Sequence, residues 1–322
     1  MFLRAVFIAA ACALLALAAI PRMDFFRWRL FDAEYGMWTA KSELLRQTQG
    51  RQRVVILGDS RIVAAYKPVG GGDSPVVNMG LGGGTPVEAY FLLRRLVDSH
   101  TRIPLLILSF APCHLEEAEV FLGRTSLFHF LEDGETEDVL AAQDGTTVLG
   151  AGRRSILNCK LRLPMCYAPF FKYLLEPGRA EKGKRFFQET RDSGGWHLFG
   201  TETPGKMPVE VGRTAFRPHP VIDAYFNRLL ALARERHIPV AFYTTPLSEG
   251  AASRVSDTYR AAFQAYLHTK AGLEIVDGGA LPLDHIGDGS HVNRQGADAV
   301  TTFIDREIVG PHMATTAVAG ER

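Results

Sequence analysis

The residue best suited to chemistry in this sequence is Ser60, in the tetrapeptide GDSR at 58–61. It directly follows the apolar run RVVIL at 53–57, whose β-branched and aliphatic residues indicate a buried strand. The Ser60 hydroxyl is therefore expected at the carboxyl end of a strand, beside backbone N–H groups that can stabilise a developing oxyanion. Asp and Ser are also common helix N-caps. The tetrapeptide alone thus allows either a nucleophile or a helix cap.

A partner for Ser60 occurs near the C-terminus, where Asp288 and His291 stand three residues apart in a glycine-rich loop. A neutral imidazole can take the proton of a serine hydroxyl, and a carboxylate on its other nitrogen fixes the tautomer. Taken alone, these two residues fit a solvent-exposed loop. Together with Ser60, they predict a Ser–His–Asp triad.

Three segments, GDSR, NMGLGGGT at 78–85 and DGSH at 288–291, together resemble blocks I, II and V of the SGNH or GDSL hydrolase superfamily. The resemblance covers about residues 53–309, interrupted by a long insertion. It implies that Ser60 is the nucleophile, and that the histidine and aspartate of DGSH are its base and the partner that orients it. It also implies an oxyanion hole formed by the backbone N–H groups of Ser60 and Gly83.

The third block of the family departs from its usual pattern in this chain. Family members have Gly-x-Asn-Asp after the third strand, with the Asn side chain donating to the oxyanion; here LSFAPCHL places Cys113 or His114 there. A thiol is a poor donor, and a neutral imidazole serves only if its N–H faces the site. Losing one such donor costs a hydrolase about 3 kcal/mol. The third donor is therefore replaced, supplied by the insertion, or absent.

The elements that must position these residues alternate between short apolar strands and helical patterns. This alternation predicts a three-layer α/β/α fold with a central parallel sheet, SGNH or flavodoxin-like, and an active site at the carboxyl ends of its strands. Strands are expected at 53–57, 75–79, 104–110, 239–245 and 273–277, and helices at 87–99, 221–237, 253–270 and 293–309.

About a hundred residues separate Cys113 from Pro218, far more than an ordinary crossover requires. We interpret them as an insertion over the carboxyl-end face, a candidate substrate-recognition subdomain with a helix at FFKYLLE. The expected organisation is a signal anchor or signal peptide at 1–23, a juxtamembrane segment at 24–50, an SGNH-like domain at 51–112 and 216–310, the insertion at 113–215, and a flexible tail at 311–322.

Four side chains are candidates for substrate binding, each with a structural alternative. Arg61 could bind an anionic group or form an ordinary salt bridge, and His114 could face the oxyanion. Trp196 and His197, in GGWHLFG, could stack on a sugar ring or anchor a buried loop.

The first 23 residues combine a short basic start with the uncharged apolar run 5–20. Such a segment is typical of a signal anchor or a signal peptide. We favour an uncleaved single-pass anchor in the inner membrane with the globular domain in the periplasm; the alternative is secretion to the periplasm after cleavage.

Composition limits the binding partners. The 36 basic and 35 acidic residues give a net charge of +1, so no overall field favours nucleic acid. No Cys or His spacing resembles a zinc site, and no metal or other cofactor is expected. Cys159 and Cys166 could close a small disulfide that leaves Cys113 unpaired, although buried thiols fit the sequence equally well.

These features predict serine-dependent O-acyl transfer or ester hydrolysis on a cell-envelope glycan through an acyl-enzyme. The chain resembles the membrane-anchored SGNH proteins of bacterial cell-surface polysaccharide or teichoic-acid O-acylation, which implies a membrane-bound O-acyltransferase as partner. The alternatives are a non-catalytic SGNH-like carbohydrate-binding or scaffold protein, and a periplasmic lipase or thioesterase.

Overall fold

The computed structural model describes residues 2–19, 23–142, 147–199 and 207–314. The chain divides into two compact units: unit 1 comprises 1–39 and 119–188, and unit 2 comprises 40–118 and 189–322. Part of the predicted insertion, 119–188, thus belongs to unit 1, whereas 189–215 belongs to unit 2. Each unit is described separately below.

Unit 2 is built on a five-stranded sheet in which all neighbouring strands are parallel, in the order β2-β1-β3-β6-β8. The first three strands in the chain consist of buried residues, as expected for strands covered on both faces. The predicted central parallel sheet is confirmed, and its order is the flavodoxin-like one. The strands are β1 Val54–Gly58, β2 Val76–Asn78, β3 Leu106–Ser109, β6 Val240–Thr244 and β8 Leu273–Asp277.

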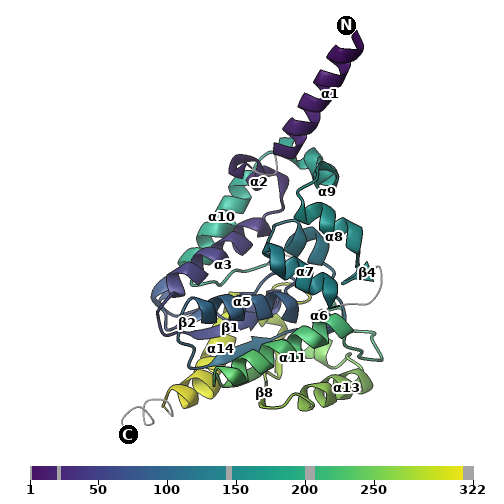
Figure 1. Cartoon of the computed structure of the whole chain (residues 1–322). Coiled ribbons are helices and arrows are strands. Elements are labelled where there is room, and N and C mark those ends of the chain that lie inside the picture. The colour runs from purple at the N-terminus through teal and green to yellow at the C-terminus, as the bar shows by residue number, and fades with distance from the viewer. Residues whose placement is uncertain (1, 20–22, 143–146, 200–206, 315–322) are drawn as a thin grey trace. The chain divides into compact units, whose positions relative to one another are not determined.

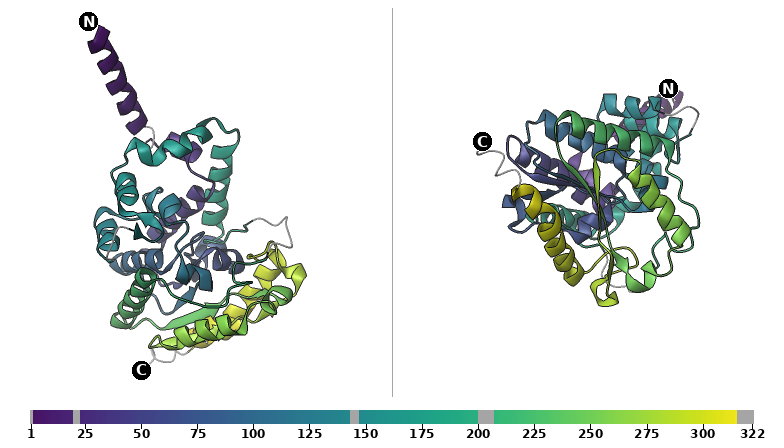
Figure 2. Two further views of the ribbon diagram at one scale, coloured as in Figure 1. Left: turned by 90° about the vertical axis from the view of Figure 1, so that its right-hand side faces the viewer. Right: turned by 90° about the horizontal axis from the view of Figure 1, so that it is seen from below.

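Helices cover both faces of this sheet (Figures 1 and 2). α5 (Pro86–Asp98) packs against α11 (Pro220–Glu235), beside which lies α13 (Asp257–His268). α4 (Ser60–Ala65) and α14 (Arg294–Ile304) pack against one another on the other face.

Alternate strand residues supply the core between the sheet and the α4–α14 pair. Ile56, Ile107 and Tyr243 come from three neighbouring strands and are fully or almost fully buried in one cluster with side chains of these two helices. Side chains two apart on a strand share a face. The intervening residues therefore face α5, α11 and α13, as Phe242 does where it meets Phe226.

The shorter elements of unit 2 lie mostly where strands lead into helices. They are η2 Gly71–Asp73, α6 Pro112–Glu116, β7 Leu247–Ser248, α12 Glu249–Ala252, β9 Ala280–Leu281, η5 Leu283–His285 and η6 Asp305–Val309. The helix expected at 253–270 is present over a shorter range as α13, Asp257–His268, and the separate turn α12 ends before the expected range begins.

Unit 1 is mainly helical and holds an aromatic core that includes Phe31, Trp38, Phe128 and Tyr167. Of the two alternatives left open by the sequence, the structure has the disulfide between Cys159 and Cys166, and Cys113 is a free thiol. The elements are α1 Phe2–Ala19, α2 Asp24–Leu30, η3 Phe121–Ser126, α7 Asp133–Ala141, β4 Thr147–Val148, β5 Ala151–Gly152, α8 Arg153–Lys160, α9 Pro164–Tyr167 and η4 Ala168–Leu175. Two further helices cross the division between the units, α3 Glu34–Thr48 and α10 Arg179–Asp192.

The segment expected to form a membrane helix is the helix α1. Within the described ranges, no helix has both the length and the apolar character needed to cross a bilayer, so that expectation gains no support. FFKYLLE, expected to be helical, lies in the 3-10 helix η4. From residue 315 on, the predicted tail lies outside the described residues.

Candidate active site

Three side chains named from the sequence meet at the carboxyl end of the sheet in unit 2. Ser60, the first residue of α4, lies with its Oγ 2.8 Å from Nε2 of His291. Nδ1 of His291 lies 2.9 Å and 3.0 Å from the two carboxylate oxygens of Asp288. Because a carboxylate only accepts, Nδ1 carries the ring proton, and Nε2 of the neutral ring can accept the proton of Ser60.

The loop that contains Asp288 and His291 is stabilised by hydrogen bonds between its own residues. Asp288 Oδ1 accepts hydrogen bonds from the backbone N–H groups of Ser290 and His291, at 2.8 Å and 2.9 Å, and Gly287 N–H donates to the His291 carbonyl at 2.8 Å. Burial alone would raise the pKa of Asp288, but the His291 ring and these two N–H groups outweigh it and lower that pKa below its ordinary value. Asp288 is therefore ionised throughout the range in which a histidine titrates.

An aromatic ring absent from the sequence predictions packs against His291. Phe199 stacks on the His291 ring with centroids 4.9 Å apart and an interplanar angle of 30°. The Phe199 ring also meets His197 edge to face at 5.3 Å. This stacking limits rotation of the base. The sequence carries no signal for it, since Phe199 and His291 are 92 positions apart.

The two candidate sugar-stacking residues of GGWHLFG serve as anchors in unit 2. The Trp196 indole N–H donates to the Ala64 carbonyl at 2.7 Å, and Lys67 and Arg294 lie over its ring at 5.3 Å and 5.8 Å. His197 is buried, with 4% of its surface exposed. The structure thus favours the alternative interpretation, in which this segment anchors a loop.

Gly83 lies in a loop that rests on the last residue of β1. Leu81 N–H donates to the Gly58 carbonyl at 2.9 Å, and a Cβ on Gly84 would come within 3.0 Å of the same oxygen. Gly83 itself has φ +68°, a left-handed conformation in which glycine carries no steric penalty. The loop expected to complete the oxyanion hole is thus held against Gly58, which lies two positions before Ser60 in the chain.

The first and last residues of the segment NMGLGGGT at 78–85 also have structural roles. The Asn78 amide donates to the carbonyls of Ile62 and Tyr66, both at 2.9 Å, which secures the C-terminal end of α4. Thr85 caps α5 in a capping box with Glu88. Asn78 and Thr85 therefore hold the elements on either side of the Gly83 loop.

Asp59, next to Ser60, is a fully buried carboxylate that accepts from three donors. Its Oδ1 accepts from Arg61 N–H at 2.8 Å; its Oδ2 accepts from Ala111 N–H at 2.6 Å and lies 2.7 Å from Nδ1 of His114. Burial would raise the pKa of Asp59, but the His114 ring, Arg61 and the Ala111 N–H together lower it. One ionised side chain thereby joins the start of α4 to the start of α6.

Neither candidate for the third oxyanion donor is a ready donor in this arrangement. The N–H of a neutral His114 ring points at Asp59, so its Nε2 is an acceptor. Burial and the neighbouring Glu210 carboxylate raise the pKa of the Cys113 thiol, which therefore stays protonated at neutral pH. Cys113 is thus not a thiolate nucleophile at that pH, and as a thiol it is a poor hydrogen-bond donor.

Arg61 forms the ordinary salt bridge that was the alternative to anion binding. Its Nη2 lies 2.7 Å from both carboxylate oxygens of Glu210, and the two side chains are 6% and 2% exposed. Burial would lower the pKa of Arg61, but Glu210 raises it above its ordinary value, and Arg61 correspondingly lowers the pKa of Glu210 despite burial. With its charge satisfied, Arg61 is not placed to bind an anionic substrate.

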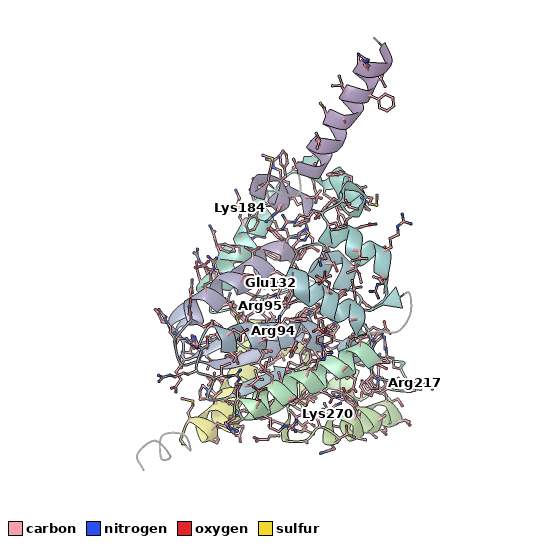
Figure 3. The ribbon with its side chains drawn as sticks, in the orientation of Figure 1. Arg94, Arg95, Glu132, Lys184, Arg217 and Lys270 are labelled. Carbon is pink, nitrogen blue, oxygen red and sulfur yellow. A yellow bond between two sulfur atoms is a disulfide. The ribbon has the colours of Figure 1, made fainter. Side chains whose placement is uncertain are left out.

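Further hydrogen bonds connect the segment that contains Glu210 to α6. Arg213 donates to Glu116 at 2.8 Å, and the backbone N–H of Arg217, labelled in Figure 3, donates to the same carboxylate at 2.9 Å. These bonds could not be predicted from the sequence, because their partners are about a hundred positions apart.

A cavity of about 350 Å³ lies beside this segment in unit 2. It is bounded by Arg61 and Pro112 and by residues at the carboxyl ends of β6 and β8, among them Thr244, Thr245 and Asp277. Apolar side chains, including Phe263, complete its wall. Its position at the strand ends and its mixed lining suit a small ligand with both hydroxyl and apolar groups.

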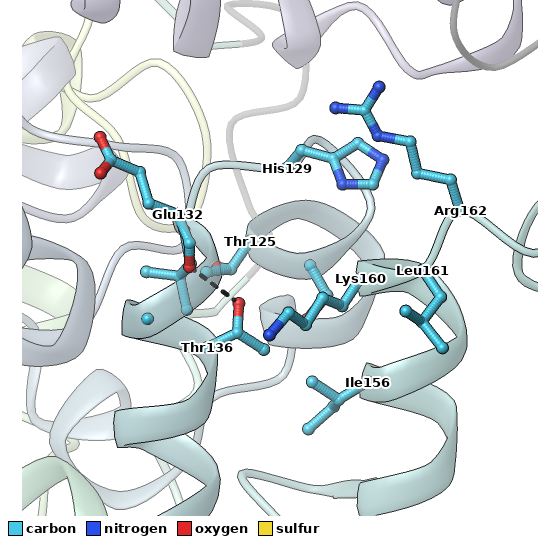
Figure 4. Close-up of a pocket in the computed structure, with 11 residues that line it drawn as sticks. Thr125, His129, Glu132, Thr136, Ile156, Lys160, Leu161 and Arg162 are labelled. Atoms are coloured by element: carbon cyan, nitrogen blue, oxygen red, sulfur yellow. Dashed lines mark hydrogen bonds between the residues drawn. The ribbon is translucent and has the colours of Figure 1, made fainter.

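Unit 1 contains a larger cavity, of about 820 Å³, shown in Figure 4. Its lining includes Lys160 and Arg162, and the Thr136 hydroxyl donates to the Glu132 carbonyl there at 3.3 Å. These side chains suit a polar ligand. The Ser60–His291 pair, however, belongs to unit 2, so we assign no reaction to this cavity.

Among the described residues, no group of three or more His, Cys, Asp or Glu side chains is arranged to hold a metal ion. No protein-family model matches the chain, and neither does any curated protein. Inference of function therefore depends on the site itself.

Proposed function

We propose that this chain is an SGNH-type serine enzyme that transfers or hydrolyses O-acyl groups of a cell-envelope glycan. The observation that carries the proposal is the 2.8 Å contact of Ser60 Oγ with a His291 ring whose other nitrogen is held by both oxygens of Asp288. That arrangement is what a nucleophilic serine requires.

In the first half-reaction, Ser60 Oγ attacks the acyl carbonyl carbon while His291 Nε2 takes its proton. The bond from that carbon to the leaving oxygen then breaks, and His291 returns the proton to the leaving group. The imidazolium that forms between these steps is stabilised by the ionised Asp288. The backbone N–H groups of Ser60 and Gly83 are the proposed donors to the oxyanion.

In the second half-reaction, water or a glycan hydroxyl attacks the acyl-Ser60 ester. His291 accepts the proton of the attacking group and gives it to the departing Ser60 Oγ. Hydrolysis and transfer share these steps and differ only in the acceptor. The envelope location and a membrane-bound O-acyltransferase partner belong to the same proposal, and their support is the N-terminal sequence and the SGNH resemblance.

The test uses the purified chain and a fluorophosphonate probe. We expect covalent labelling at Ser60, and loss of p-nitrophenyl acetate cleavage by at least about a thousandfold in Ser60→Ala and His291→Ala. His285→Ala is the matched control, because His285 is bonded to Asp284 at the protein surface. No labelling of the folded chain would refute the proposal; unchanged cellular function of Ser60→Ala would favour a non-catalytic binding role instead.

A further inference from the structure

A second histidine–carboxylate pair, His114 with Asp59, lies at the same sheet edge as the triad. Gly58 of β1 is in register with Ser109 of β3, so the segments that follow these two residues leave the sheet side by side. The Ala111 N–H and the His114 ring both bond to Asp59, the residue immediately before the nucleophile. His114 is therefore fixed next to the turn that carries Ser60.

One ring nitrogen of His114 is hydrogen-bonded to Asp59, and the other can bind a ligand. Nδ1–H donates to the Asp59 carboxylate at 2.7 Å. Asp59 is wholly buried, whereas the His114 side chain is 21% exposed, so solvent reaches the ring from the side away from Asp59. In the neutral ring Nε2 then presents a lone pair on the accessible side.

The ionisable groups around His114 have partners of their own. Arg61 is paired with Glu210, and Cys113 on the same short helix remains a thiol. Glu116, also on α6, binds Arg213. With Nδ1–H bonded to Asp59, Nε2 of the neutral His114 ring is the atom that can accept from a hydroxyl outside the protein.

We propose that His114 Nε2 binds a hydroxyl of the acyl acceptor next to the one that attacks acyl-Ser60. The inference rests on the proposed function and specifies its acceptor as a polyol or sugar with two neighbouring hydroxyls. The attacking hydroxyl forms its bond to the acyl carbon and gives its proton to His291, while the second hydroxyl donates to His114 and keeps its proton. His114 is therefore a positioning residue for the acceptor, and no additional reactant is needed.

The experiment compares acceptors that differ by one hydroxyl. The full chain is incubated with p-nitrophenyl acetate and either propane-1,2-diol or propan-1-ol, and acetylated alcohol and free acetate are quantified by mass spectrometry. We expect transfer to the diol to be preferred, and His114→Ala to reduce that preference between about two- and tenfold, the worth of one hydrogen bond. His285→Ala is the control and should leave the preference unchanged.

The rate of fluorophosphonate labelling at Ser60 separates the outcomes. Unchanged labelling of His114→Ala with a lost diol preference supports the inference. The inference is overturned if the wild-type chain shows no diol preference, if His114→Ala keeps it, or if this variant loses hydrolysis and transfer equally, which would indicate a role at the oxyanion. Absence of labelling in the wild-type chain would refute the proposed function instead.

Discussion

Removal of Glu210 should destabilise unit 2 severely, because it leaves the buried Arg61 guanidinium without its counter-charge. Both side chains are at most 6% exposed, and both oxygens of Glu210 lie 2.7 Å from Arg61 Nη2. Removing one partner of such a pair costs about 3–5 kcal/mol. Domains of this kind have about 5–15 kcal/mol of stability in total, so Glu210→Ala should lose a large fraction of it.

The assay follows urea unfolding through Trp196, which lies in unit 2, whereas Trp28 and Trp38 lie in unit 1. A Trp28→Phe, Trp38→Phe background makes the emission specific to unit 2. In that background Glu210→Ala should lower the unfolding free energy by about 3–5 kcal/mol.

Two further variants show whether the unpaired charge is the cause. The double change Arg61→Met, Glu210→Leu removes both charges of the pair and should recover most of the loss. Glu117→Ala removes a half-exposed partner of Arg213 and should change the unfolding free energy by less than about 1 kcal/mol. A loss below about 1 kcal/mol in Glu210→Ala, or a double variant as unstable as the single one, would refute this explanation.

Three other predictions concern separate parts of the chain. Replacing Cys159 and Cys166 by serine should lower the stability of unit 1 by about 2–3 kcal/mol through lost loop constraint, seen in thermal melts, with labelling at Ser60 unchanged. Gly58→Ala should prevent soluble folding, because its Cβ would lie 1.9 Å from the Ser109 carbonyl oxygen; a wild-type melting temperature would contradict this. The lowered pKa of Asp288 stabilises the fold above the unfolded-state pKa of about 4, and this contribution is lost as pH falls through the lower folded-state value. Asp288→Asn should therefore weaken the acid dependence of unfolding below about pH 4.

The sequence was informative where local pattern determines structure. Aliphatic runs such as 53–57 predicted the buried parallel strands, and the three-residue spacing of Asp288 and His291 is compatible with their contact within one loop. No sequence pattern indicates that these two residues contact Ser60. They were paired with it because a nucleophilic serine requires a histidine base and a carboxylate. The sheet geometry then brings the three together across 231 positions of chain.

Contacts that join distant segments could not be predicted in the same way. Nothing near Glu210 indicates that Arg61 will be its partner, and the stacking of Phe199 on the base depends on how a loop returns to the sheet. Arg61, Trp196 and His197 each carried a functional and a structural interpretation. Their burial and hydrogen bonds support the structural interpretation in each case. Burial and hydrogen bonding depend on the surrounding fold, so residue type alone could not decide between the two.

The buried carboxylate of Asp59 limits which residue can precede Ser60. Its two oxygens receive three N–H groups, from α4, from the residue that precedes α6 and from the His114 ring. An asparagine has one accepting oxygen and would turn an NH₂ group toward at least one of these donors; a glutamate would place its carboxylate one methylene further out. The position therefore requires a short side chain that only accepts, and that requirement is independent of whether Ser60 reacts.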